Sequence, residues 1–198
     1  MPRLLLILFA TLVSGAFAVA QAEWKAAEKI VTYPVSGTTG MALYQSIGEN
    51  GPVIGNGVRA IAHTTFKLLW SRDYQPRGTA CVLASARPSL TITYTLPKPS
   101  AALPPAMKAK WDTFLAGIRK HEAVHGQNIR DLVGEIERVS VGLTVENDPG
   151  CKKIRDDLQG RLKVLSDARL KKESDFDRLE MSPGGNVHQL ILALVNGG

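Results

Sequence analysis

A helical periodicity of apolar residues, from about residue 106 to residue 139, is the sequence feature that most constrains the fold. Its apolar side chains recur at spacings of three and four, which places them on one side of an α-helix. They are Trp111, Phe114, Leu115, Ile118, Ile129, Leu132, Val133 and Ile136. Pro104 and Pro105 suit the start of a helix. We therefore predict one long helix whose apolar stripe packs against the rest of the domain.

A second helix is predicted from Cys151 to about Glu180. Ile154, Leu158, Leu162 and Leu165 form its early apolar stripe, and Pro183-Gly184-Gly185 ends it. The tail from Val187 is apolar again and is expected to form a last strand or a docked segment.

Strands and loops are predicted for residues 23–99. Strands are expected at 29–33, 80–86 and 89–96, a short helix capped by Thr39 is expected to reach about Ile47, and the glycine-rich stretch 48–57 is expected to be a loop. In 89–96 apolar and hydroxyl side chains alternate, which is typical of a strand with one buried face. Because this strand directly precedes the long helix, it is expected to pair with an extended substrate by β-addition.

The first residues have the layout of a secretory signal peptide. Arg3 supplies a positive charge, 4–17 is almost entirely apolar, and small residues follow at 18–22. The alternative, a membrane anchor, needs about 20 apolar residues, and this stretch is shorter. We expect residues 1–22 to be a signal peptide, no stable membrane span after its removal, and residues 23–198 to form a single domain.

Two cysteines, Cys81 and Cys151, remain in the mature chain. An exported chain meets an oxidising compartment, where an even pair is usually a disulfide. Two zinc thiolates are the weaker alternative, because neither cysteine belongs to a short Cys-x-x-Cys or Cys-x-x-His unit.

The chain has a net charge of +6, with the densest basic run between Lys152 and Lys172. A solvated helix face explains such a run. No aromatic stacking pattern or known binding motif accompanies the charge, so we expect no nucleic-acid partner.

His121-Glu122-Ala123-Val124-His125 lies in the middle of the long predicted helix. Histidines four residues apart project from nearly the same side, so both rings can reach one metal ion. They also continue the apolar stripe, which points them inward. In this motif the histidines bind zinc, and the glutamate takes a proton from the water that zinc polarises. The alternative is a pair of helix histidines that only pack or face water.

A catalytic zinc normally has three protein ligands, so one more ligand must lie elsewhere in the chain. Glu173, Asp177 and Glu180 share one side of the second helix and are candidates, although a solvated acidic stripe would look the same. Glu135 and Glu137 lie too far along the helix that carries the histidines. His63 and His188 have no supporting spacing.

The sequence resembles a bacterial family of predicted secreted zinc-dependent proteases, domain-of-unknown-function family 922. The resemblance covers most of the mature chain. It rests on Tyr33-Pro34-Val35-Ser36-Gly37, Gly51-Pro52, Gly78-Thr79-Ala80-Cys81, Trp111, the His-Glu-x-x-His motif, Cys151 and Phe176-Asp177. It implies a metallopeptidase activity and supports a disulfide between Cys81 and Cys151.

One segment departs from that family's pattern. Its members tend to follow a Tyr-Asp pair with Thr-x-His-Gly, whereas this chain has Phe176-Asp177 followed by Arg178-Leu179-Glu180-Met181. A role for the missing histidine in the metal site or in substrate handling would imply an altered or inactive protein. With Asp177 as the third ligand the site survives, and we predict that ligand.

The sequence thus predicts a zincin-like α+β domain, in which a small, mainly antiparallel sheet precedes the motif helix and a second long helix. The predicted function is a monomeric, exported zinc metallopeptidase in the periplasm or the medium, acting on peptide or protein substrates. His121, His125 and Asp177 bind zinc, and Glu122 is the general base. The alternative is a catalytically degenerate family member that serves as an interaction module of the cell envelope.

Overall fold

A computed structural model describes residues 24–196 except 56, so the predicted signal peptide lies outside the described residues. The elements are β1 (Ala27–Val35), α1 (Gly40–Asn50), β2 (Val53–Ile54), β3 (Val58–Arg59), β4 (His63–Arg77), β5 (Ala80–Pro99), α2 (Pro105–Ser140), β6 (Thr144–Val145), α3 (Lys153–Met181) and α4 (Asn186–Val195). The predicted α+β class and both long helices are confirmed, as is the short helix, which Thr39 caps by accepting a hydrogen bond from the backbone N–H of Ala42.

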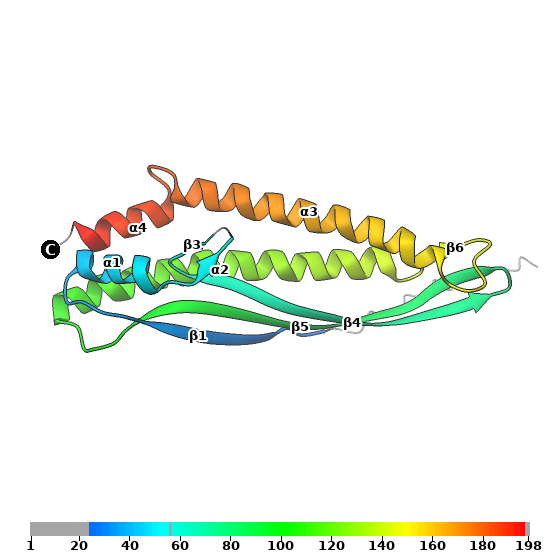
Figure 1. The fold of residues 1–198 in the computed structure, drawn as a ribbon, viewed down its shortest axis with the longest axis horizontal. Coiled ribbons are helices and arrows are strands. Elements are labelled where there is room, and N and C mark those ends of the chain that lie inside the picture. Colours follow the sequence, from blue (N-terminus) through cyan, green and yellow to red (C-terminus); the bar gives the residue numbers. More distant parts are fainter. Residues whose placement is uncertain (1–23, 56, 197–198) are drawn as a thin grey trace, which may run out of the picture.

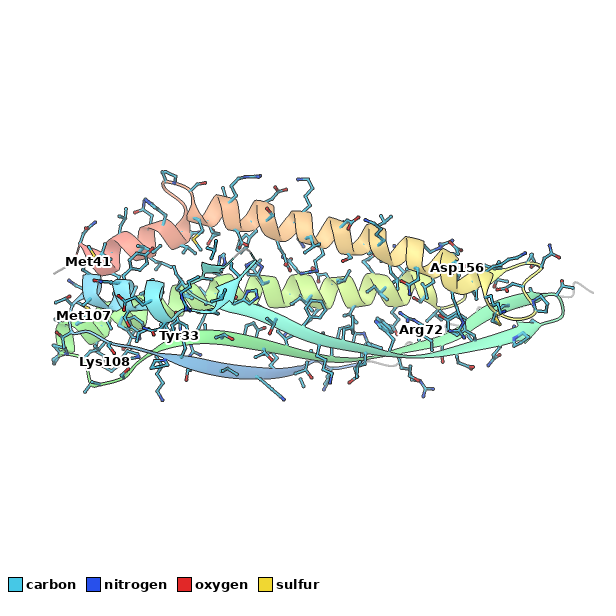
Figure 2. All side chains as sticks on the ribbon, in the orientation of Figure 1. Tyr33, Met41, Arg72, Met107, Lys108 and Asp156 are labelled. Atoms are coloured by element: carbon cyan, nitrogen blue, oxygen red, sulfur yellow. A yellow bond between two sulfur atoms is a disulfide. The ribbon has the colours of Figure 1, made fainter. Side chains whose placement is uncertain are left out.

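The molecule is elongated, with α2 between the sheet and α3 (Figure 1). α1 and α4 lie at one end, whereas β6 and the start of α3 lie at the other. The labelled side chains show the same division: Tyr33, Met41 and Met107 lie at the α1 end, and Arg72 and Asp156 lie towards the far end (Figure 2). α2 has 36 residues, which at 1.5 Å per residue is a length of about 54 Å. This helix therefore determines the long axis.

The main sheet has the order β1-β5-β4, and β6 adds a short pair to β5. β4 and β6 run antiparallel to β5, whereas β1 runs parallel to it. The sheet is therefore mainly antiparallel, as predicted, with one parallel pair. β1 and β4 flank β5 on both sides over residues 91–95. The prediction that this part of the chain pairs with a substrate is therefore wrong, because both of its edges are already hydrogen-bonded.

Residues 80–99 form one strand instead of the two predicted. Pro88 lies inside this strand, although proline cannot donate a hydrogen bond to a strand ladder. In the structure Pro88 pairs with Trp70 of β4, and β1 begins to pair with β5 only at Thr91. Proline is tolerated where β5 has a strand partner on one side only.

Two further segments differ in part from the prediction. The loop expected at 48–57 contains the last residues of α1 and the strand β2, which pairs with β3 just beyond it. The apolar tail is a docked segment, as one of the two alternatives had it, but it forms the helix α4 on α1 and α2 and not a strand. Two glycines make this packing close: a Cβ on Gly40 would lie 1.8 Å from the Leu194 carbonyl oxygen, and one on Gly117 would lie 2.2 Å from Leu190 Cδ1.

The buried face of α2 contributes to two apolar clusters. Phe114 and Ile118 pack with Val35, Leu43 and Leu194 in the first. Ile129 and Val133 pack with Leu90 and Ile92 in the second. Between these clusters the same helix face buries His121 and Glu122, with relative exposures of 6% and 5%. The fold therefore places the only charged part of the stripe between two apolar layers that hold the helix on the sheet.

Cys81 and Cys151 form the predicted disulfide, which ties the segment before α3 to β5. It lies in a third apolar cluster with Leu83, Ile154 and Leu158. In the described part of the chain, no helix combines the length and the apolar character needed to cross a membrane.

Replacing both cysteines with serine is expected to lower the free energy of unfolding by about 4 kcal/mol, because the bridge closes a loop with a sequence separation of 70. Urea unfolding followed by circular dichroism measures this loss. Dithiothreitol should destabilise the wild type and leave the double variant unchanged. An equal effect of dithiothreitol on both proteins would contradict the prediction.

Candidate metal centre

The two motif histidines lie in the middle of α2 with their rings turned towards each other. Their Nε2 atoms are 3.1 Å apart. The side chains are largely buried, with relative exposures of 6% for His121 and 12% for His125. The spacing of four residues on a regular helix, together with the packing of α2 on both sides of the motif, brings these two nitrogens together.

Asp177 reaches the same point from α3. Its Oδ1 atom lies 3.3 Å from His121 Nε2 and 2.9 Å from His125 Nε2. The Asp177 side chain is half exposed, with a relative exposure of 50%. The structure therefore brings together all three residues that were predicted to bind zinc, from two helices far apart in the sequence.

The three atoms form a group that could hold a metal ion. Ligands 2.0–2.1 Å from a tetrahedral zinc ion lie roughly 3.3 Å from one another, and the three separations here are 3.1, 3.3 and 2.9 Å. Imidazole nitrogen and carboxylate oxygen are also suitable zinc donors. The geometry and chemistry of this donor set therefore fit a metal ion such as zinc.

The charges of the group depend on one another. Burial alone would raise the pKa of Asp177, but hydrogen bonds from His121 and His125 outweigh it and hold that pKa far below its usual range. Burial would lower the pKa of His125, but its hydrogen bond to Asp177 and the negative charges of Asp177, Glu122 and Glu173 raise it. Without a metal ion, the neighbouring carboxylates therefore favour a proton on His125. A metal ion would have to displace this proton, so its binding would weaken as the pH falls.

Glu122, the predicted general base, is buried beside the metal-binding group. Its Oε2 atom accepts a hydrogen bond of 2.5 Å from Thr64 Oγ1 on β4. Tyr94 of β5 lies nearby, and burial and the charge of Glu122 raise the pKa of its phenol. A Cβ on Gly126 would lie 2.2 Å from the Tyr94 hydroxyl. The close approach of α2 to the sheet at Gly126 thus brings Glu122 within reach of both strands.

The other two acidic residues of the α3 stripe lie near the histidines in different ways. Glu180 Oε2 is 3.7 Å from His121 Nδ1, on the side of the ring that faces away from Asp177. Glu173 forms an ion pair of 2.6 Å with Arg169. Glu180 stands three residues after Asp177, at the position where the Thr-x-His-Gly pattern has its histidine. Neither residue joins the three-atom group.

The remaining candidates from the sequence lie elsewhere. Glu135 pairs with Arg138, and Glu137 accepts a hydrogen bond from Trp24. His188 Nδ1 accepts a hydrogen bond of 3.4 Å from the Gly184 backbone N–H. His63 lines the cleft beside the site but does not belong to the metal-binding group.

The site opens into a cleft with a volume of about 350 Å³. Its walls come from the β2–β3 hairpin, the first residues of β4, α2 and α3. The residues that line it include Ile54, Val58, Ile61, His63, Thr64, His121, Glu122, His125, Glu173, Asp177 and Met181. A ligand in this cleft can therefore reach the three donor atoms and Glu122.

Sequence reasoning missed two side chains that arrange the site. Thr64 binds Glu122, and Phe176 stacks on His121 with ring centroids 4.8 Å apart and an angle of 18° between the planes. Nothing in the local sequence around Thr64 pointed to the site. Phe176 was visible only as the neighbour of Asp177.

The comparisons with known proteins identify a family but no characterised relative. A family model described as a bacterial protein of unknown function, DUF922, matches residues 30–185. The match includes both histidines, Asp177 and both cysteines, and it ends just before α4. Neither the comparison with curated proteins nor that with solved structures found a match.

Replacing Asp177 with alanine is expected to weaken zinc binding by at least tenfold, because one of three protein donors is lost while the histidines remain. Asp175→Ala is the matched control: Asp175 lies on the same helix but pairs with Lys171 and Arg178. Zinc content after dialysis, measured by mass spectrometry, distinguishes the two. Equal zinc content in Asp177→Ala and the control would exclude Asp177 as a ligand.

Proposed function

The chain belongs to the bacterial family of unknown function DUF922, and we propose that it is an exported zinc-dependent peptidase. The observation that carries this proposal is the convergence of His121 Nε2, His125 Nε2 and Asp177 Oδ1 on one point of an open cleft, with Glu122 beside them. Three donors with a free fourth position are the arrangement of a catalytic zinc rather than of a structural one.

Each residue has a distinct task in this proposal. His121, His125 and Asp177 hold the metal ion. When bound, zinc acts as a Lewis acid and lowers the pKa of water to about 7. Glu122 accepts a proton from the water whose oxygen adds to the carbonyl carbon. It then gives that proton to the leaving amine nitrogen as the C–N bond breaks. Thr64 holds the Glu122 carboxylate through Oε2.

The edge of the sheet supports a peptide as the substrate. Among the described residues, β4 pairs with β5 on one side and with no strand on the other. His63 and Thr64, at the start of β4, line the cleft. An extended peptide added along this free edge would form main-chain hydrogen bonds and would pass the metal-binding group. β4 thus takes the role that the sequence suggested for residues 89–96.

The disulfide supports export. Disulfides persist in oxidising compartments such as the bacterial periplasm and the medium, and the Cys81–Cys151 bridge is buried in an apolar cluster. The signal peptide expected at residues 1–22 would deliver the chain to such a compartment.

Replacing Glu122 with glutamine is expected to lower the rate of peptide hydrolysis by 10²- to 10⁴-fold, because the amide cannot accept the proton. Zinc content should not change, since Glu122 is not among the three donors. The assay follows cleavage of a mixed peptide library by mass spectrometry.

Glu135→Gln is the control, because Glu135 lies on the same helix but pairs with Arg138 at its exposed side. Zinc-loaded wild type that cleaves nothing, or a Glu122→Gln variant as active as the control, would refute the peptidase proposal. The first result would favour the interaction module.

A further inference from the structure

The second ring nitrogen of His121 has an unusual environment. Nδ1 is buried, and the described residues offer it no hydrogen-bond partner within normal distance. A buried N–H or lone pair without a partner costs about 1–3 kcal/mol. In metal sites this second nitrogen almost always donates to a carboxylate, a carbonyl or water, which fixes the ring and its tautomer. The position around Nδ1 therefore calls for an acceptor.

Glu180 is placed to be that acceptor. Its Oε2 atom lies 3.7 Å from His121 Nδ1, and the residue is buried, with a relative exposure of 8%. Its other oxygen, Oε1, accepts a hydrogen bond of 2.6 Å from Asn186 Nδ2, at the first turn of α4. Oε1 is thereby occupied and Oε2 is left facing the histidine.

The surroundings hold the two groups in this relation. Phe176 stacks on one face of the His121 ring, and the ring nitrogens make their polar contacts at the ring edge. On that side, His121 and Glu180 line a cavity with a volume of about 690 Å³, together with Phe176, Asn186 and Gln189. A shift of less than 1 Å in the Glu180 side chain would bring Oε2 within the 2.7–3.2 Å range of an N–H···O bond.

We propose that Glu180 is a positioning residue for the metal centre. It accepts the N–H of His121 Nδ1, and this selects the tautomer whose Nε2 lone pair faces the metal ion. Asn186 holds the Glu180 carboxylate and so links α4 to the metal site. The inference rests on the proposed metal-binding function, and it gives the last carboxylate of the α3 stripe a task other than ligation.

The test compares Glu180→Gln and Asn186→Ala with wild type and with Gln189→Ala. Gln189 lines the same cavity, but its side chain is not hydrogen-bonded to His121 or Glu180. Zinc affinity is measured by competition with a chromophoric chelator. Glutamine keeps the shape of glutamate but has no negative charge, so it is a weaker acceptor for the His121 Nδ1–H. Glu180→Gln is therefore expected to weaken zinc binding 10- to 100-fold, Asn186→Ala less, and Gln189→Ala less than twofold.

A second readout does not need zinc. Long-range ¹H–¹⁵N spectra of the metal-free protein report the Nδ1 proton of His121 and its hydrogen bond. Wild type should show a downfield, hydrogen-bonded Nδ1 proton, and Glu180→Gln should move this signal upfield. A packing defect alone would lower stability without this change at Nδ1.

Two results would overturn the inference: zinc affinity of Glu180→Gln within twofold of wild type, or the same Nδ1 proton signal in both proteins. Wild type that binds no zinc but has the Glu180-dependent Nδ1 signal would instead refute the proposed metal-binding function and keep the Glu180–His121 contact. The two failures are therefore distinguishable.

Discussion

The candidate site depends on α3 lying along α2, because the two histidines come from one helix and Asp177 from the other. This contact has little apolar support of its own. The buried residues of α3 are Ile154 and Leu158 at its start and Glu180 at its end. The disulfide fixes the start to β5, and the contact of Glu180 with Asn186 joins the end to α4. α3 is thus held at both ends, and the polar groups of the site lie near the second of them.

The site also requires that α2 bury charged residues while it stays packed on the sheet. Apolar residues on both sides of the motif keep α2 packed: Phe114 and Ile118 lie in a cluster before the motif, and Ile129 and Val133 lie in a cluster after it. Burying His121 and Glu122 unpaired would be unfavourable. Asp177 and Thr64 provide their partners. The same face of α2 therefore serves for both packing and chemistry.

The sequence predicted what local periodicity determines and missed what long-range contacts determine. The two long helices, the cap at Thr39 and the position of His121 and His125 follow from spacing along one segment. The parallel pairing of β1, the continuity of β5 through Pro88 and the helical tail depend on partners distant in the sequence. For the same reason, spacing could place Glu173, Asp177 and Glu180 on one face of a helix but could not tell that Asp177 meets both Nε2 atoms, whereas Glu180 faces Nδ1.

The central claim is that α2 and α3 together bind one zinc ion, and a crystal structure of the zinc-loaded protein tests it most directly. Anomalous diffraction at the zinc edge would locate the ion. We expect one zinc about 2.0–2.2 Å from His121 Nε2, His125 Nε2 and an Asp177 carboxylate oxygen, with its fourth position open to the cleft. A zinc ion bound elsewhere, or bound by both histidines with Asp177 turned away, would contradict the account.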